Sequence, residues 1–266
     1  MQEHVFKIKA EGDLQNALQK SLNAHGDLKK TLTSGDKLLL LPNFNTADEF
    51  PGSTDMSFLK EVVGQILNTD VTKIYIGASS TIAMVKKTED VLEEKGVYEL
   101  EDADPRVEVV NFDKYEWIQK KIPHGKYLKK ASVPELLEET NKMILLPCLK
   151  THCLAQFTGA LKLTVGMMKP SERVALHAKN IQEKIAELNL LFNPDLVVMD
   201  ARKCFIRKGP MKGPTEEPDI IMSSPSRVKI DLAGREIIKS YKKNSLDKIN
   251  PEQLSQIKRA VEVGVS

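Results

Sequence analysis

The sequence predicts an α/β fold with a mostly parallel β-sheet and helices on both faces, arranged as one large domain or as two lobes. Strand-like runs alternate with segments whose apolar residues recur every three or four positions, as in amphipathic helices. Some of these runs, such as residues 37–41 (KLLLL), are apolar without alternation, which is expected when helices cover both faces of a sheet. A chain of 266 residues, 41% of them hydrophobic, can bury such a core.

The elements of the first half follow from local patterns. Leu14, Leu18 and Leu22 recur at helical spacing, and Gly26 ends that helix. The expected order is a strand at 4–10, a helix at 13–26, a strand at 37–41, a helix at 57–67, a strand at 72–76, a helix through about residue 95 and a strand at 106–111. The small polar turn at 77–81 could bind an anion at a helix N-terminus, or its serines could only cap the helix.

The second half continues the alternation. The expected order is a strand near 126–133, a short helix at 134–141, a strand at 142–147, a helix from about 171 to 192, strands at 195–200 and 219–224, and helices at 229–241 and 251–263. The segment 112–135 is mixed in character, so any boundary between two lobes is expected there.

Composition and charge exclude several kinds of partner. The net charge is only +2, from 39 basic and 37 acidic side chains, and aromatic residues make up 5% of the chain. We therefore expect no nucleic-acid partner, and the longest apolar runs are too short to span a membrane. The N-terminal residues do not form a signal peptide, and three cysteines do not suggest a disulfide framework, so a cytoplasmic location is predicted.

The stretch 146–177 is the strongest candidate for a functional site, because it follows the buried strand at 142–147. His152 could act as a general base or bind a metal, and His177 could work with it. The alternatives are a histidine satisfied by hydrogen bonds at a strand end for His152, and a surface or packing histidine for His177. Lys162 completes the candidate catalytic set.

Basic and small polar residues in this stretch suggest an anionic ligand. Lys162 lies in an apolar helical segment, where an unpaired ammonium group is unfavourable to bury, and Lys150 follows the strand. Lys162 could snorkel to solvent, or both lysines could face an anion in a cleft. The alternative for both is ion pairs with Asp or Glu. Thr151, Thr158 and Gly159 belong to the same predicted anion-binding set.

Two further loops are expected near this site. Asn43 and Asn45 end the strand at 37–41 and could line the same crevice. Arg202, Arg207 and Lys208, in a loop fixed by Gly-Pro pairs, could bind a carboxylate or phosphate, or the loop could simply be solvated.

Metal binding is a weaker interpretation of the same residues. Asp200 ends a strand and could ligate a metal with His152 and His177, or it could only cap a turn. Cys148, Cys153 and Cys204 lack the close spacing of structural zinc sites and are more typical of buried apolar residues. The sequence lacks the common motifs of Rossmann dinucleotide-binding proteins, P-loop nucleoside triphosphatases, zinc proteases and serine hydrolases.

Four motifs together resemble an uncharacterised family, domain of unknown function 362. They are LPN at 41–43, LKTH at 149–152, FTGALK at 157–162 with Gly166, and VMD at 198–200 followed by Gly209-Pro210 and Gly213. Asp231 also matches a family residue. The chain departs from the family pattern at Leu41, where Lys is usual, and at Leu163, where Asn is usual. Some family members carry a ferredoxin-like iron–sulphur module, but the cysteines here do not form the run that such a four-cysteine cluster needs.

A second resemblance is to the catalytic domain of the lactate racemase family. In that family a His, a Lys that anchors a nickel-pincer cofactor, and a His that ligates nickel occur in the order of His152, Lys162 and His177, at similar spacing. Here the Gly-Gly before the lysine is replaced, and the early Arg-containing motif is missing. This resemblance implies a shared fold and site position.

Two functions from different classes follow. The first is an enzyme that acts on a small anionic metabolite, with acid–base chemistry by the histidines. The second is a metal- or iron–sulphur-related accessory protein for redox or cofactor chemistry. The oligomeric state is left open by the sequence.

Overall fold

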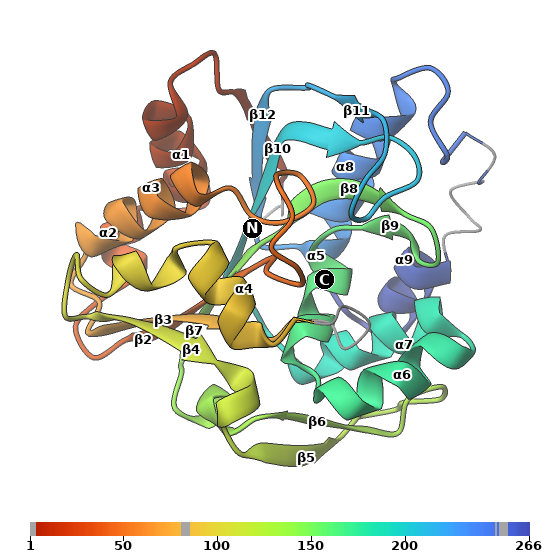
Figure 1. Cartoon of the computed structure of the whole chain (residues 1–266), viewed down its shortest axis with the longest axis horizontal. Coiled ribbons are helices and arrows are strands. Elements are labelled where there is room, and N and C mark those ends of the chain that lie inside the picture. Colours follow the sequence, from red (N-terminus) through yellow and green to blue (C-terminus); the bar gives the residue numbers. More distant parts are fainter. Residues whose placement is uncertain (1–3, 81–85, 248, 250–254) are drawn as a thin grey trace.

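A large mixed β-sheet forms the centre of the computed structural model, which describes residues 4–80, 86–247, 249 and 255–266 (Figure 1). The strand order is β1-β12-β10-β7-β2-β3-β4, and the pairs within β10-β7-β2-β3-β4 are parallel. The strands are β1 (Phe6–Lys9), β2 (Lys37–Pro42), β3 (Lys73–Ala78), β4 (Val107–Asn111), β7 (Lys142–Leu146), β8 (Cys148–His152), β9 (Gln156–Thr158), β10 (Leu196–Phe205), β11 (Thr215–Glu216) and β12 (Ile220–Ser224). The predicted α/β fold with a mostly parallel sheet is confirmed.

Helices cover both faces of this sheet (Figure 1). They are α1 (Leu14–Asn23), α2 (Leu28–Thr31), α3 (Met56–Leu67), α4 (Thr88–Glu94), α5 (Ala160–Leu163), α6 (Pro170–Ala178), α7 (Ile181–Leu188), α8 (Arg227–Lys239) and α9 (Ser255–Glu262), with 3₁₀ turns η1 (Val97–Leu100), η2 (Phe112–Lys114), η3 (Glu135–Glu138), η4 (Thr164–Met167) and η5 (Asn189–Leu191). Strand β2 shows why its sequence is apolar throughout: Leu38 and Leu40 pack with α1 and α3, whereas Leu39 and Leu41 pack with α5, α7 and α8.

The segment 112–135 forms a separate two-stranded antiparallel sheet, β5 (Trp117–Lys121) and β6 (Lys130–Pro134). Ile122, Ala131 and Val133 belong to the same apolar core as α5 and α7. This segment, where the sequence placed a possible lobe boundary, therefore packs onto one side of the central sheet.

Several sequence expectations differ from the structure. The strand expected at 195–200 continues to Phe205 and so includes Arg202, which was expected in the loop, and the short helix expected at 134–141 is only the 3₁₀ turn η3. The strand at 142–147 does not lead directly into a loop, because the chain continues as β8, which pairs with β10 and turns back into β9. The helix expected at 171–192 is interrupted where Lys179 is extended and Asn180 is left-handed, with φ of 52°. The apolar helix around Lys162 is short and continues as the 3₁₀ turn η4.

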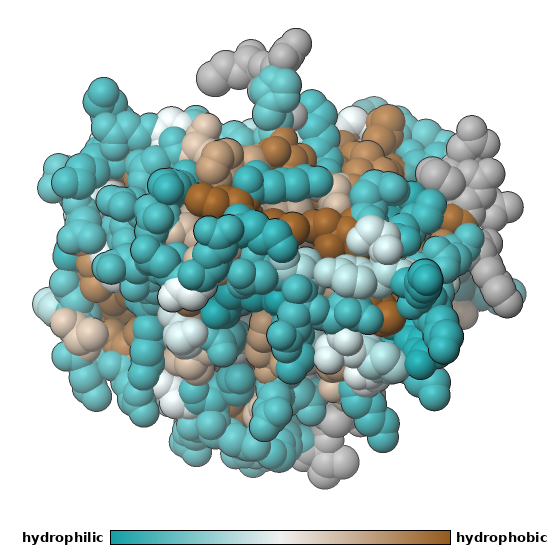
Figure 2. All heavy atoms as spheres, turned by 90° about the horizontal axis from the view of Figure 1, so that it is seen from above, coloured by the Kyte–Doolittle hydropathy of each residue, from teal (hydrophilic) through white to brown (hydrophobic). Residues whose placement is uncertain are grey.

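Two helix starts expected from the sequence, after residue 80 and at residue 251, lie partly outside the described residues. In the described part, no helix is long and apolar enough to cross a membrane. Hydrophilic side chains cover most of the face shown in Figure 2, with apolar side chains visible between them.

Candidate functional site

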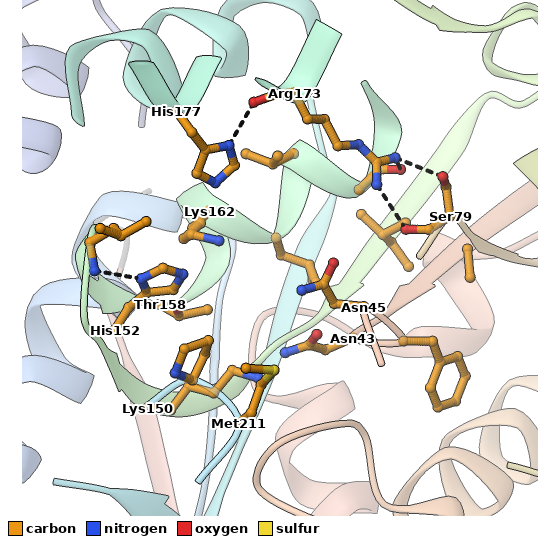
Figure 3. Close-up of a pocket in the computed structure, with 18 of the residues that line it drawn as sticks. Asn43, Asn45, Ser79, Lys150, His152, Thr158, Lys162, Arg173, His177 and Met211 are labelled. Atoms are coloured by element: carbon orange, nitrogen blue, oxygen red, sulfur yellow. Dashed lines mark hydrogen bonds between the residues drawn. The ribbon is translucent and has the colours of Figure 1, made fainter. Parts of the chain in front are cut away.

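A cavity of about 430 Å³ lies beyond the carboxyl ends of β2 and β3, where open α/β sheets generally bind ligands (Figure 3). Strand β8, η4 and α6 form other walls. The described residues that line it are Leu41, Pro42, Asn43, Phe44, Asn45, Ala78, Ser79, Lys150, His152, Cys153, Leu154, Thr158, Lys162, Leu163, Val165, Gly166, Arg173, Val174, His177, Pro210 and Met211. Most of the predicted site residues are thus brought together. Leu41 and Leu163, the two departures from the family pattern, also line the cavity.

The β8–β9 hairpin aims the polar side chains at the cavity. Lys150 pairs with Thr158 across the two strands, and His152 follows Lys150 by two positions, so all three side chains face the same side of the hairpin. Thr151 faces the other way, and its hydroxyl accepts a hydrogen bond from the backbone N–H of Gly209. A Cβ at Gly209 would lie 2.1 Å from the carbonyl oxygen of Thr151, which explains glycine there. Thr151 therefore supports the loop after β10 and does not line the cavity.

His152 presents a hydrogen-bond donor to the cavity. Its Nδ1 accepts hydrogen bonds from the backbone N–H groups of Leu154 and Ala155, both at 3.1 Å. Since backbone N–H groups can only donate, Nδ1 is unprotonated and the proton of the neutral ring is on Nε2. Burial, followed by the positive charges of Lys162 and Lys150, lowers the pKa of His152 to about 2, so the ring stays neutral at physiological pH.

His177 presents the opposite group. Its Nδ1 lies 2.6 Å from the carbonyl oxygen of Arg173 in the preceding helical turn. A carbonyl oxygen can only accept, so Nδ1 carries the proton and Nε2 of the neutral ring has a free lone pair. Figure 3 shows this second nitrogen turned towards the amine of Lys162. The two histidines therefore offer one donor and one acceptor to the same cavity.

Two lysines contribute positive charge. Lys150 is buried, and its ammonium group donates to the carbonyl oxygen of Gly52, in the loop that follows β2. Lys162 is partly exposed, and no carboxylate in the described part of the chain forms a salt bridge with either lysine. Burial lowers the pKa of each ammonium group to about 8, and Lys150 and Arg173 add to the effect at Lys162. Among the described residues this argues against ion pairs for Lys162, and leaves an anion in the cavity or contact with solvent as its explanation.

Arg173 is a cavity residue that the sequence did not reveal as part of the site. Its guanidinium group is buried and donates to the carbonyl oxygens of Met168, Ser79, Ser80 and Gly166 and to the hydroxyl of Ser79. Burial lowers its pKa to about 10. Arg173 thus ties α6 and η4 to the end of β3 while adding a third positive charge. An arginine four residues before a histidine on one helix face was the only available signal.

Uncharged polar groups complete the lining. Two hydrogen bonds between Asn43 and Thr54 close the loop after β2. The backbone N–H of Asn43 donates to the Thr54 hydroxyl at 2.7 Å, and the backbone N–H of Thr54 donates to the carbonyl oxygen of Asn43. The Asn43 side chain, with that of Asn45, is left to face the cavity (Figure 3). The hydroxyl of Thr158 is buried with no hydrogen-bond partner in the described part of the protein. A ligand would supply one.

Close packing against α8 explains why residue 159 is a glycine. Its missing side chain admits Asp231 of α8, because a Cβ there would lie 2.1 Å from Asp231 Oδ1. The Asp231 carboxylate accepts from the backbone N–H groups of Ala160 and Leu161, at 2.6 and 3.1 Å, and so caps α5. Burial raises the pKa of Asp231 to about 7. These contacts fix the short helix that carries Lys162, although Gly159 itself does not line the cavity.

The loop after β10 reaches the cavity through different residues from those expected. Pro210 and Met211 line it, whereas Arg202, Arg207 and Lys208 do not. Arg202 instead pairs with Asp200 at 2.7 Å and with Asp55 at 3.2 Å. Asp200 is buried and held by this arginine.

The candidate metal ligands are not gathered by the fold. Within residues 4–80, 86–247, 249 and 255–266, no three His, Cys, Asp or Glu side chains form a group that could hold a metal ion. Cys148 and Cys204 are buried, and burial raises the pKa of their thiols to about 11 and 12. Cys153 is exposed and lines the cavity alone among the three.

The chain is an α/β protein in which Lys150, Lys162 and Arg173 line a cavity at the carboxyl ends of parallel strands. The model of the family described as domain of unknown function (DUF362) matches residues 38–236, and the chain belongs to this family. No curated protein matched the sequence.

Two solved structures align with this chain at low identity. The lactate racemase apoprotein from Thermoanaerobacterium thermosaccharolyticum aligns with a TM-score of 0.51 and 16% identity, over 89% of this chain and 57% of that one. A structural-genomics protein from Thermotoga maritima aligns with a TM-score of 0.49 and 14% identity, over 86% of this chain and 59% of that one. The chain thus spans less than two thirds of either protein.

Proposed function

We propose that this protein is an enzyme that binds a small carboxylate or phosphate in the cavity, where His177 exchanges protons with it while His152 donates a hydrogen bond to it. One observation carries the proposal: Lys150, Lys162 and Arg173 line a cavity to which the described residues contribute no Asp or Glu side chain. Burial lowers the pKa of both lysines, and the charges of Lys150 and Arg173 lower that of Lys162 further, so the charged ammonium groups are unfavourable in this cavity. A bound anion would remove it.

The two histidines give the proposal its chemistry. The neutral ring of His152 donates from Nε2 to an oxygen of the ligand, which stabilises negative charge that develops there. The lone pair of His177 Nε2 accepts a proton from the ligand. The two histidines have opposite tautomers, each fixed by backbone groups. His152 can therefore donate a hydrogen bond from Nε2 while Nε2 of His177 accepts a proton.

A metal-bearing cofactor is the second candidate, and it rests on His177 Nε2, which has the free lone pair that a metal needs. His152 suits a metal less well, because its Nε2 carries the proton while two backbone N–H groups face Nδ1. Elemental analysis of protein purified without oxygen separates the two candidates. A near-stoichiometric metal that is lost in His177→Gln would favour the cofactor.

Thermal unfolding at low ionic strength tests anion binding. A panel of acetate, lactate, succinate, phosphate and pyrophosphate is compared on the wild type, Lys162→Met and the matched control Lys20→Met. Lys20 is exposed on α1, on the opposite face of the sheet. A ligand at about 100 times its Kd should stabilise the wild type and the control by about 2.7 kcal/mol, and Lys162→Met far less. Equal stabilisation of all three proteins, or of none, would overturn the proposal.

Proton transfer needs its own readout. The carboxylate that binds best is incubated with the protein in D₂O, and deuterium incorporation at its carbon-bound hydrogens is followed by NMR. We expect exchange in the wild type and its loss in His177→Gln, a substitution on an exposed helix surface that leaves the fold intact. Binding without exchange would reduce the function to anion binding.

A further inference from the structure

Large apolar side chains that are exposed to solvent gather at the cavity. In the described part of the chain they are Leu154, Val174, Met211 and Val261, and the first three line the cavity. Their exposed fractions are 62% for Leu154, 66% for Val174 and 40% for Met211. Single exposed apolar residues are ordinary, but three that converge on one concave site mark a binding surface.

These three residues, which we call the apolar rim, come from separate parts of the chain. Leu154 lies in the turn between β8 and β9, Val174 on α6, and Met211 in the loop after β10. Each belongs with polar groups of the site: the backbone N–H of Leu154 donates to His152, Val174 follows Arg173, and Met211 lines the same cavity as Lys150 and Asn43 (Figure 3). A ligand held by the charged groups would therefore also contact the rim.

Much of the remaining cavity lining is apolar as well. Leu41, Phe44, Leu163 and Val165 are buried residues that line the cavity. A volume of about 430 Å³ falls within the range of roughly 300–1,000 Å³ that holds drug-sized ligands. Acetate or inorganic phosphate alone would leave most of this apolar surface uncovered.

We infer that the ligand is an amphipathic anion, with a carboxylate or phosphate head between the lysines and an apolar body of several carbons against the rim. The inference rests on the proposed function and adds its substrate class. Leu154, Val174 and Met211 are then the residues that determine specificity for the body, since burial of each methylene there adds affinity without any polar contact. Met211, with its flexible unbranched chain, can adapt to bodies of different shape.

Two homologous series measured by calorimetry test this: straight-chain carboxylates from acetate to octanoate, and alkyl phosphates from methyl to hexyl. In the wild type, affinity should rise about two- to fourfold per methylene in the series whose head group fits. The variant Leu154→Ser/Val174→Ser/Met211→Ser should lose most of this rise, so that its affinities for the short and the long members of the series become similar. Val261→Ser removes an equally exposed residue from α9 and should keep the full rise.

The outcomes separate the inference from the proposed function. Equal affinity along both series in the wild type, or an unchanged rise in the triple variant, would overturn the amphipathic ligand. If the short anions then still bind the wild type and fail to bind Lys162→Met, the proposed anion site survives. If no member of either series binds the wild type, the anion site fails as well, and the inference with it.

Discussion

Replacement of Lys162 by methionine should stabilise the protein while abolishing anion binding. A fall of the Lys162 pKa from 10.5 to about 8 corresponds to about 3 kcal/mol against the charged form in the folded protein. The side chain is partly exposed, so solvent screens part of this energy. We therefore expect Lys162→Met to raise the free energy of unfolding by about 1–2 kcal/mol at pH 7, and Tm by roughly 2–6 °C.

The dependence of this gain on pH checks its cause. Below about pH 8 the lysine is charged in both the folded and the unfolded protein, and the fold carries the full penalty. Between about pH 8 and 10.5 the folded protein releases the proton first, so the penalty fades. The difference in unfolding free energy between Lys162→Met and the wild type should shrink over this range.

Urea unfolding at pH 7 and pH 9.5, on the wild type, Lys162→Met and Lys20→Met, measures both quantities. The exposed Lys20 should give differences within about 0.5 kcal/mol at either pH. Destabilisation by Lys162→Met, or a gain that does not change with pH, would refute the idea that a poorly solvated, unpaired ammonium group lies in the cavity.

Three more outcomes follow from the site. His152→Ala should lower the free energy of unfolding by about 1 kcal/mol, because two backbone N–H groups lose their acceptor. It should also weaken anion binding roughly 10- to 100-fold in titrations. Unchanged affinity would mean that His152 only supports the structure of the hairpin. Gly159→Ala should lower the unfolding free energy by about 1–3 kcal/mol in urea unfolding, since its Cβ would displace the Asp231 carboxylate; wild-type stability would contradict this packing. Anion affinity, measured from pH 6 to 10, should be constant below about pH 8 and fall above it as Lys150 and Lys162 lose their protons; a flat profile would exclude both lysines.

Apolar periodicity was sufficient to predict most of the fold. The run at 37–41 predicted a strand buried on both faces. In the structure β2 has a parallel strand on each side, β3 and β7, and helices cover both of its faces. The break at Asn180 was not predictable in the same way, because the apolar spacing continues through it and only one residue is left-handed. The β8–β9 hairpin was missed because its strands are short and one follows Pro147 directly.

The site was predicted where it follows a recognised strand and missed where tertiary contacts decide the arrangement. Lys150 and His152 were expected at the site because they follow the strand at 142–147, whereas their common orientation comes from β8, a strand that the sequence did not predict. Arg202 has the chemistry of an anion ligand, but Asp200 and Asp55 already hold it, and no local pattern revealed that Asp55 would be near. The apolar rim joins residues from three distant segments and required the fold.

Proton uptake on binding tests the central claim most directly. The wild type is titrated at pH 8 with the carboxylate that stabilises it most, in two buffers with different enthalpies of ionisation. Lys150 and Lys162, each with a pKa of about 8, are then about half protonated, and a carboxylate bound between them should draw in up to about one proton in total. Because the carboxylate does not itself titrate at this pH, the uptake belongs to the protein. Binding that takes up no proton, or that releases protons, would contradict an anion held by these two lysines.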